Sequence, residues 1–289
     1  MKKVAIFTGN RAEYGLLAPV IKSISNHPSL KSYLLVSGAH LDVNFGKTLD
    51  EIKRDGFKDF YEIKINMSAD TLHSTAKAIG SGILSISDKI IEIKPDVFVV
   101  YADRFEGFAA MIASTQMNIP TVHIEGGDIT EGGALDDSVR HSMTKLAHIH
   151  LTTNDEASKR IMNMGEESWR VHTVGFPLID FIKEKNYESK NNLVQKFNLD
   201  LEKPLIVFTQ HSVTTEFKDA KKQILPSLAA LKKAIKNDIQ VIITFPNNDA
   251  GGIAIINQIQ KFSSIKSKNL KIIQSLGRYN YHGLLALSL

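Results

Sequence analysis

Acidic and basic side chains directly follow two short apolar runs of the sequence. Asp103 and Arg104 come after residues 97–101, and Glu125 comes after residues 121–124. Carboxylates that converge on one crevice raise one another's pKa, and a carboxylate then becomes a competent acid or base near neutral pH. A structural ion pair is the alternative for Asp103 and Arg104. The spacing predicts a cluster of acid–base groups.

A metal is the competing explanation for clustered carboxylates. The metal-like spacing in the sequence is His148 and His150, which neither an H-E-x-x-H nor a D-x-D motif accompanies. The chain has no cysteine, which excludes disulfides, thiolate nucleophiles and cysteine-containing zinc sites. We therefore expect chemistry by carboxylates, histidines and hydroxyls, with no metal and no cofactor.

Charged groups also lie where helices are expected to begin. Residues 9–14 place Arg11 and Glu13 behind a glycine, which favours an anion at a helix N-terminus and is not a G-x-G-x-x-G dinucleotide motif. A capped helix with a surface arginine is the alternative there. Asp136 and Asp137 are helix N-caps in the simplest interpretation.

The second half of the chain offers a histidine and an amide-rich loop. His211 follows residues 205–209, and Asn247 and Asp249 follow residues 239–244. Ligands of parallel sheets bind beyond the carboxyl ends of the strands, so we expect these side chains to face a ligand. An ordinary capped turn also explains the loop.

The elements that must position these groups alternate between β-branched runs and amphipathic stretches, which is typical of βαβ units around a parallel sheet. The strands predicted in the first half are residues 4–8, 33–37, 60–65, 97–101, 121–124 and 149–152. The helices predicted between and after them are residues 14–25, 45–54, 72–93, 106–116, 139–146 and 154–164, before an extended piece at 170–175.

The charged stretch 183–192 has no apolar alternation to bury, and we interpret it as a linker. Beyond it, the pattern predicts strands at 205–209, 239–244 and 271–274, and helices at 220–236, 252–262 and from about 279. We expect an α/β protein with two Rossmann-like domains, residues 1–182 and residues 183–289. Each domain carries a doubly wound parallel sheet.

Composition excludes several classes of protein. Of the 289 residues, 43% are hydrophobic and 23% are charged, as in average globular proteins. The 35 basic and 31 acidic residues are too balanced for a dedicated nucleic-acid binder. No apolar run reaches the ~18 residues that a membrane-spanning helix needs. We expect a cytoplasmic protein that binds neither nucleic acid nor membrane.

Six segments, in order and over nearly the whole chain, carry a resemblance. They read TGNRAEY (8–14), ADR (102–104), HIEGGD (123–128), DDSVRH with TKLAH (136–148), QHSVTT (210–215) and FPNNDAG (245–251). Together they resemble the UDP-N-acetylglucosamine 2-epimerase family, and especially its hydrolysing branch, which starts sialic-acid and related nonulosonic-acid biosynthesis.

The resemblance implies a GT-B-like pair of domains that binds a nucleotide-sugar. It also implies that UDP leaves the anomeric carbon as the C2 proton is lost, which gives a glycal-like intermediate. Water then adds with inversion at C2, so the products are UDP and N-acetylmannosamine or a 2,4-diacetamido analogue. We expect a UDP-sugar substrate and a homodimer or homotetramer.

The matching positions receive roles from the resemblance, because each proton transfer needs a carboxylate within reach and a departing diphosphate needs cations. The catalytic candidates are Asp103, Glu125, Asp136 and His211. The substrate-binding candidates are Arg11, Glu13, Arg104, Asp137, Asn247 and Asp249.

The chain also departs from the family pattern. Family members continue past the helix near residue 279 into a strand and a Gly-Asn-Ser-Ser-x-Gly segment that clamps UDP, so we expect an incomplete second domain. A catalytically silent nucleotide-sugar-binding fragment is one alternative. A GT-B-type glycosyltransferase is another, although a transferase needs no base at C2 and the clustered carboxylates therefore favour the epimerase.

Overall fold

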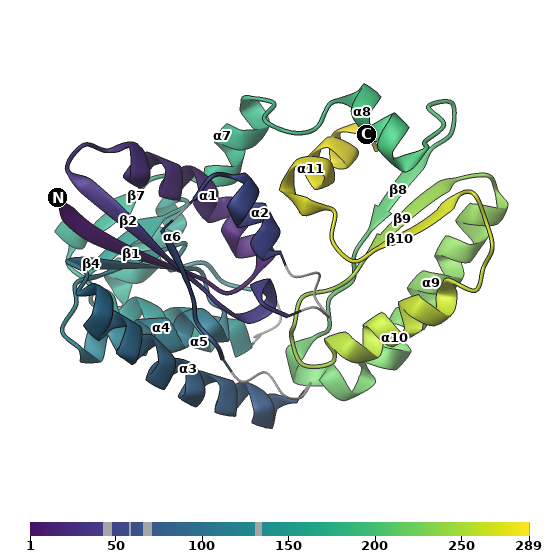
Figure 1. Cartoon of the computed structure of the whole chain (residues 1–289). Helices are drawn as coiled ribbons and strands as arrows, with labels where there is room; N and C mark the ends of the chain where they lie inside the picture. Colours follow the sequence, from purple (N-terminus) through teal and green to yellow (C-terminus); the bar gives the residue numbers. More distant parts are fainter. Residues whose placement is uncertain (43–47, 58, 66–70, 131–134, 289) are drawn as a thin grey trace. The chain divides into compact units, whose positions relative to one another are not determined.

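The computed structural model describes residues 1–42, 48–57, 59–65, 71–130 and 135–288. These residues form two compact units, of which the first extends to Asp180 and the second begins at Phe181. Each unit contains one parallel sheet, drawn in purple to teal in the first unit and in green to yellow in the second (Figure 1). No helix among the described residues is long and apolar enough to cross a membrane.

The first unit is built on a parallel sheet that has seven strands within the described residues, in the order β3-β2-β1-β4-β5-β6-β7. The strands are β1 (Lys2–Thr8), β2 (Leu30–Val36), β3 (Phe60–Glu62), β4 (Val97–Tyr101), β5 (Thr121–Ile124), β6 (Ile149–Thr152) and β7 (Val171–Thr173). The chain builds outward from β1 in one direction and then from β4 in the other. Ligands of such sheets bind at this switch point, beyond the carboxyl ends of the strands.

Helices cover both faces of this sheet. They are α1 (Arg11–Asn26), α2 (Leu49–Arg54), α3 (Leu72–Ile93), α4 (Phe105–Gln116), α5 (Leu135–Leu146) and α6 (Asp155–Asn163), with the 3-10 turns η1 (Gly38–His40) and η3 (Ser168–Arg170). Helices α3, α4 and α5 pack on one face and α1 and α2 on the other. Helix α7 (Pro177–Lys183) spans the division between the units.

Strand β1 shows why the sheet is covered on both sides. Successive side chains of a strand point to opposite faces. Ala5 and Phe7 are buried against the α3–α5 layer, and Val4 and Ile6 are buried against the α1–α2 layer. A strand buried on both faces is a continuous apolar run, and that is how residues 4–7 read in the sequence.

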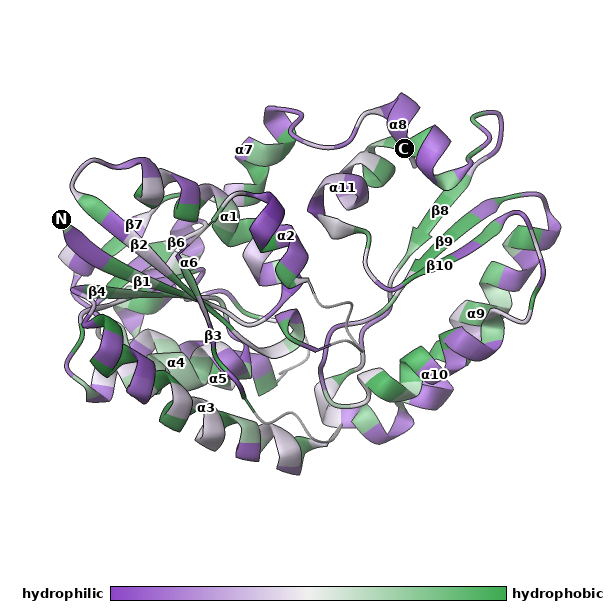
Figure 2. Cartoon of the chain, viewed as in Figure 1, coloured by the Kyte–Doolittle hydropathy of each residue, from purple (hydrophilic) through white to green (hydrophobic). Residues whose placement is uncertain are grey.

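The second unit has a parallel sheet with three strands in the described residues, in the order β10-β9-β8. Its elements are α8 (Lys190–Phe197), β8 (Leu205–Phe208), η4 (Thr214–Asp219), α9 (Ala220–Lys236), β9 (Gln240–Thr244), α10 (Gly252–Phe262), β10 (Leu270–Ile273) and α11 (Gly277–Leu287). Helices α9 and α10 pack on one face, and α8 and α11 on the other. The three strands are mostly hydrophobic, whereas α9 and α10 alternate hydrophobic and hydrophilic residues along their length (Figure 2).

The predicted fold class, α/β with a parallel sheet in each half, is confirmed. The last three residues of the stretch 183–192, which is interpreted as a linker, are exposed but helical, because α8 begins at Lys190. The Ser189 side chain caps this helix by accepting a hydrogen bond from the Asn192 N–H, and Leu193 is fully buried. The apolar periodicity that marks α8 lies mostly beyond the stretch and was therefore not visible within it.

The helix predicted at 139–146 starts earlier than expected, since α5 begins at Leu135. Asp136 and Asp137 therefore lie in its first turn, and the N-cap interpretation of these residues is wrong. Residues 131–134, which precede the helix, lie outside the described residues, as does most of residues 45–48 at the predicted start of α2. The extended piece predicted at 170–175 is β7, an edge strand of the first sheet.

Candidate active site

Two left-handed residues shape the carboxyl edge of the first sheet. Ala102, after β4, has φ 54°, and Glu125, after β5, has φ 62°, conformations that non-glycine residues rarely adopt. The Ala102 N–H donates to the Ile124 carbonyl at 2.8 Å, and the Glu125 N–H donates to the Leu151 carbonyl at 2.9 Å. These bonds join β4, β5 and β6 at the edge where Asp103 and Glu125 emerge. Outliers of this kind cluster at functional sites.

Arg140, on α5, gathers the acidic groups of this edge. Its guanidinium donates to the Asp103 carboxylate, to Asp137 Oδ1 at 2.8 Å and to the Asp128 carbonyl at 2.9 Å. The Arg140 side chain is buried. Hydrogen bonds from a planar guanidinium fix both the direction and the distance of the carboxylates they reach. Asp103 and Asp137 are thereby brought together, although they lie on different elements.

Glu125 has the titration behaviour of an acid–base group. Burial, and then the neighbouring negative charge of Asp128, raise the pKa of Glu125 to about 7, against the opposing effect of Arg140. The Tyr101 hydroxyl donates to Glu125 Oε2. The Asp128 carboxylate is itself held by the Thr153 hydroxyl at 3.0 Å. A carboxyl group with a pKa near 7 both accepts and returns a proton at neutral pH.

Two buried carboxyl groups, those of Glu13 and Glu106, lie near the end of β1. The Gly9 N–H donates to Glu13 Oε2 at 2.9 Å, and the Asn10 side chain caps α1 by accepting from the Glu13 N–H at 3.1 Å. Burial raises the pKa of Glu13 to about 8, the backbone hydrogen bond from Gly9 opposes this, and the charge of Glu106 adds to it. Arg104 Nε lies 3.4 Å from Glu106 Oε2.

These contacts bear on the alternative interpretation of Asp103 and Arg104 as a structural ion pair. Asp103 pairs with Arg140 and Arg104 pairs with Glu106, so each of the two adjacent residues serves a different cluster. The left-handed Ala102 redirects the chain at this point, and Arg104 then becomes the N-cap position of α4. Arg11 is the first residue of α1 and is partly buried.

Asp136 lies one turn before Arg140 on α5 and is partly buried. The two residues are therefore neighbours on one helix face. Asp136 thus joins Asp103, Asp137 and Glu125 at the same end of the sheet by its position on α5, while Arg140 contacts Asp103 and Asp137 directly.

A buried histidine, His123, forms hydrogen bonds beneath the carboxyl edge of the first sheet. His123, on β5, donates through Nε2 to the carbonyl of the left-handed Ala102 at 2.6 Å, and the Thr144 hydroxyl lies 3.3 Å from its Nδ1. Burial lowers the pKa of His123 to about 4, so the ring is neutral and its hydrogen bonds persist at neutral pH. The same Thr144 hydroxyl donates to the Arg140 carbonyl at 3.1 Å. His123 thus connects the Asp103 loop to the helix that carries Arg140.

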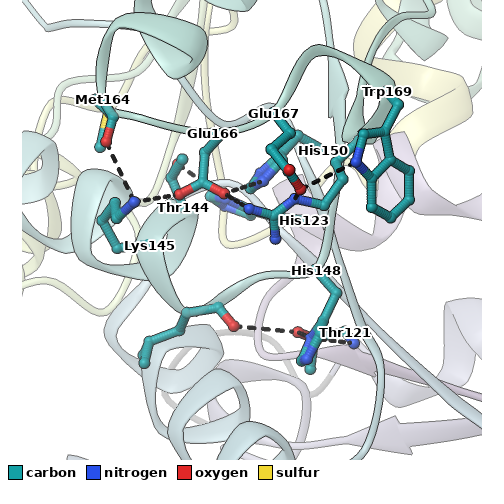
Figure 3. Close-up of polar contacts among 12 residues, drawn as sticks. Thr121, His123, Thr144, Lys145, His148, His150, Met164, Glu166, Glu167 and Trp169 are labelled. Carbon is teal, nitrogen blue, oxygen red and sulfur yellow. Dashed lines mark hydrogen bonds and ion pairs between the residues drawn. The ribbon is translucent and has the colours of Figure 1, made fainter.

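The His148 and His150 pair has structural partners. Figure 3 shows both histidines: His148 Nδ1 accepts from the Thr121 N–H at 3.1 Å, and His150 Nε2 lies 3.4 Å from Glu166 Oε2. Lys145, on α5, also donates to Glu166. In the described part of the chain no group of three or more histidine, aspartate or glutamate side chains is placed to hold a metal ion.

In the second unit, His211 and the loop after β9 meet at the carboxyl ends of two adjacent strands. The Asn247 N–H donates to His211 Nδ1 at 3.3 Å, and the Ser212 hydroxyl donates to the Ala250 carbonyl at 2.6 Å. The His211 ring is exposed. The loop after β8 is therefore tied to the loop after β9.

The loop after β9 leads into the N-terminus of α10. Gly251 has φ 87°, and a Cβ there would lie 2.9 Å from the Phe217 carbonyl oxygen, so only glycine fits. Asp249 is partly buried and its carbonyl accepts from the Gly252 N–H at 2.9 Å. Helix N-termini favour anions, because their first N–H groups lack partners within the helix.

Three residues of the first-unit site were not identified from the sequence. Arg140 carried a signal, because it lies on the helix predicted at 139–146, three and four residues after two aspartates. Glu106 carried a weaker one, in the first turn of a helix just after a buried strand. Tyr101 carried none, since a tyrosine that ends an apolar run is ordinarily a core residue.

Comparisons with known proteins identify the family of this chain. A family model described as UDP-N-acetylglucosamine 2-epimerase matches residues 22–289. A Campylobacter jejuni protein described as GDP/UDP-N,N'-diacetylbacillosamine 2-epimerase (hydrolyzing) is 32% identical over 290 residues, which cover 99% of this chain and 74% of that protein. A Neisseria meningitidis serogroup B protein described as UDP-N-acetylglucosamine 2-epimerase is 33% identical over 268 residues, which cover 92% of this chain and 68% of that protein.

A solved structure shares the fold. The crystal structure of UDP-GlcNAc 2-epimerase from Neisseria meningitidis bound to UDP-GlcNAc matches with a TM-score of 0.79 and 22% sequence identity. The match covers 100% of this chain and 76% of that chain. A likeness at this identity establishes the arrangement of strands and helices.

Proposed function

The chain belongs to the UDP-N-acetylglucosamine 2-epimerase family, and we propose that it is a hydrolysing member, which converts a UDP-2-acetamido sugar into UDP and the free 2-epimer. The observation that carries this proposal is the cluster of Asp103, Glu125 and Arg140 at the switch point of the first sheet. The 32% identity, over nearly the whole chain, to a protein described as hydrolysing supports the choice of water as the acceptor.

The proposed reaction has two steps. In the first, a carboxylate takes the proton from C2 of the sugar, the C2 electron pair forms a C1–C2 double bond, and the C1–O bond breaks with its electrons passing to UDP. In the second, water adds its oxygen to C1 and C2 receives a proton on the opposite face. The products are UDP and a manno-configured acetamido sugar, so atoms and charge balance without a redox partner.

Asp103, Glu125 and Asp136 are the proposed acid–base groups for these transfers. The pKa of about 7 for Glu125 suits a group that takes one proton and returns another in the same turnover. Arg140 holds Asp103 through a charged hydrogen bond, which fixes the position of that carboxylate. Asp137 shares the same guanidinium and is proposed to bind substrate beside these groups.

We propose that the diphosphate is bound by cations and helix N-termini. Arg11 and Arg104 lie at the starts of α1 and α4, where backbone N–H groups already favour an anion. Glu13, buried next to Arg104 and Glu106, is proposed to orient that end of the site.

In the second unit, the exposed His211 is proposed as a catalytic residue that lies near the phosphate and the sugar. Asn247 and Asp249 are proposed to form a platform for the nucleotide, since they precede the N-terminus of α10.

The sugar, the assembly and the domain limits are further parts of the proposal. Relatives described as acting on N,N'-diacetylbacillosamine and on N-acetylglucosamine are almost equally similar, so both UDP-sugars are candidate substrates. We also propose that the protein acts at the start of sialic-acid or related nonulosonic-acid synthesis. We propose further that it is cytoplasmic and forms a homodimer or homotetramer. The proposed domains remain residues 1–182 and 183–289.

The proposal is tested by product analysis. The protein is incubated with UDP-N-acetylglucosamine and, separately, with the UDP-linked 2,4-diacetamido-trideoxy sugar; UDP is measured by anion-exchange chromatography and the sugar by proton NMR. We expect equal amounts of UDP and free manno-configured sugar from at least one substrate. A product that still carries UDP, or the absence of product from both substrates, contradicts the proposal.

A further inference from the structure

Tyr101 ends strand β4 directly before the left-handed Ala102. Its side chain is 2% exposed and packs in the core formed by β1, β4, α1 and α2. Tyr101 lies opposite Ile124 in the β4–β5 register, so its ring is one residue away from the left-handed Glu125. From this position its hydroxyl donates a hydrogen bond to Glu125 Oε2.

The geometry gives the two oxygens of Glu125 different tasks. We propose that Tyr101 is a positioning residue, whose hydroxyl engages Glu125 Oε2 and leaves Oε1 as the oxygen that exchanges a proton with the substrate. The inference rests on the proposed function, because it concerns the acid–base role of Glu125. The rigid ring, clamped by the core, fixes a carboxyl group that otherwise pivots at the end of a flexible side chain.

Burial has the largest effect on the pKa of Glu125 and raises it, and three groups that face Glu125 act in addition. Asp128, on the loop after β5, raises the pKa of Glu125, and Arg140, on α5, lowers it. The Tyr101 hydroxyl, on β4, donates to the carboxylate, and a donated hydrogen bond favours the charged form. Removal of this hydroxyl alone should therefore raise the pKa of Glu125, while the two charges stay in place.

The test compares wild type with Tyr101→Phe, which keeps the ring and removes the donor. The Glu125 carboxyl is followed by carbon-13 NMR in ligand-free protein and assigned with Glu125→Gln. We expect its titration midpoint to rise by about one to two pH units, since a hydrogen bond to a charged group is worth that much. The corresponding limb of the kcat pH profile should move in the same direction, with KM changed less than twofold.

The matched control is Tyr61→Phe, a tyrosine of β3 whose ring stacks on Tyr33 at a centroid distance of 6.2 Å. It should change neither the midpoint nor the profile. A second measurement replaces all seven tyrosines by 3-fluorotyrosine, which keeps the ring and the hydroxyl group of each. The fluorinated hydroxyl is a stronger donor, so the Glu125 midpoint should fall.

The inference is overturned if the Glu125 midpoint is the same in wild type and Tyr101→Phe, or, where that variant does not fold, if 3-fluorotyrosine leaves the midpoint unchanged. The carboxyl titration does not depend on turnover. An inactive wild type with a shifted midpoint in the variant would therefore reject the proposed function and keep the Tyr101–Glu125 interaction.

Discussion

At the scale of single residues, Arg140 organises the first-unit site. Its guanidinium reaches Asp103, Asp137 and the Asp128 carbonyl from one buried position. A lysine offers one compact charge without a planar fork, so it cannot replace these contacts together. The carboxylates are thus held near one another, at separations where like charges would otherwise repel.

Glu125→Gln should lower kcat by a factor of about 10² to 10⁴, the usual contribution of one acid–base group. Glutamine keeps an oxygen that can accept from Tyr101, so the fold should remain. The pKa of about 7 predicts that the wild-type rate changes with pH around neutrality, and this change should vanish in the variant. Steady-state kinetics across pH 5–9 measure both effects.

The control for this variant is Glu156→Gln on α6, where the side chain is 76% exposed and pairs with Lys159. It should leave kcat and the pH profile as in wild type. A Glu125→Gln enzyme that keeps more than half of the wild-type kcat would remove Glu125 from the proposed catalytic groups.

Glu13→Gln should flatten the dependence of stability on pH. The pKa of Glu13 is raised to about 8 in the folded protein, chiefly by burial. Between the ordinary value near 4.5 and about 8, the folded state keeps a proton that the unfolded state releases, so stability falls as pH rises, by up to about 1.4 kcal/mol per pH unit. Glutamine has no proton to lose and should remove this slope.

Urea unfolding at pH 5 and pH 7.5 provides the measurement for Glu13. The single tryptophan, Trp169, lies in the first unit and reports its unfolding by fluorescence. Unfolding free energies that fall in parallel for wild type and Glu13→Gln between the two pH values would show that Glu13 is already ionised in the folded protein.

The residues at strand ends were predictable from sequence, whereas their partners were not. Asp103 and Glu125 follow buried strands, and this local pattern was sufficient to find them. The pairing of Asp103 with Arg140 spans 37 residues and joins the loop after β4 to α5. Asp103 and Arg104 are adjacent in the sequence but have different partners, Arg140 and Glu106. The sequence alone does not reveal the partner of each charge.

At the scale of elements, the close contact between α3 and α4 depends on small residues. Gly82 of α3 is buried, and a Cβ on it would lie 2.9 Å from the Cβ of Ala109 on α4. Because glycine and alanine are small, the turn of α3 that carries Gly82 lies close to the turn of α4 that carries Ala109. Gly80, in the same helix, has open space around its would-be Cβ.

These two glycines give a matched pair of variants. Gly82→Ala should destabilise the first unit by about 1–3 kcal/mol, because overpacking displaces α3 or α4. Gly80→Ala should stabilise it by about 0.5–1 kcal/mol, because alanine loses less backbone entropy in a helix. Urea unfolding followed by Trp169 fluorescence measures both. Equal effects of the two substitutions would contradict the observed helix packing.

The helices and strands of both units followed from periodicity where their faces are strongly apolar. Helix α8 did not, because its short buried face, including Leu193, lies beyond a charged stretch and its start depends on the Ser189 cap. The early start of α5 was also missed. After Leu135 its first turn continues with Asp136, Asp137 and Ser138, which are polar, so hydrophobic periodicity begins only at Val139.

At the scale of the whole molecule, the two units carry different chemistry. The first concentrates carboxylates and arginines at the carboxyl edge of its sheet, and the second presents a histidine and amide groups before a helix N-terminus. Proton transfer at a sugar needs the first kind of group. A helix N-terminus such as that of α10 favours an anionic group.

The most direct test of this account is turnover of the UDP-sugar in deuterium oxide enriched in oxygen-18, with products analysed by mass spectrometry and NMR. We expect free manno-configured sugar with one deuterium at C2, together with UDP that contains no oxygen-18, because the C1–O bond breaks and C2 is reprotonated from solvent. Retention of the original hydrogen at C2, or oxygen-18 in the β-phosphate of UDP, would contradict it.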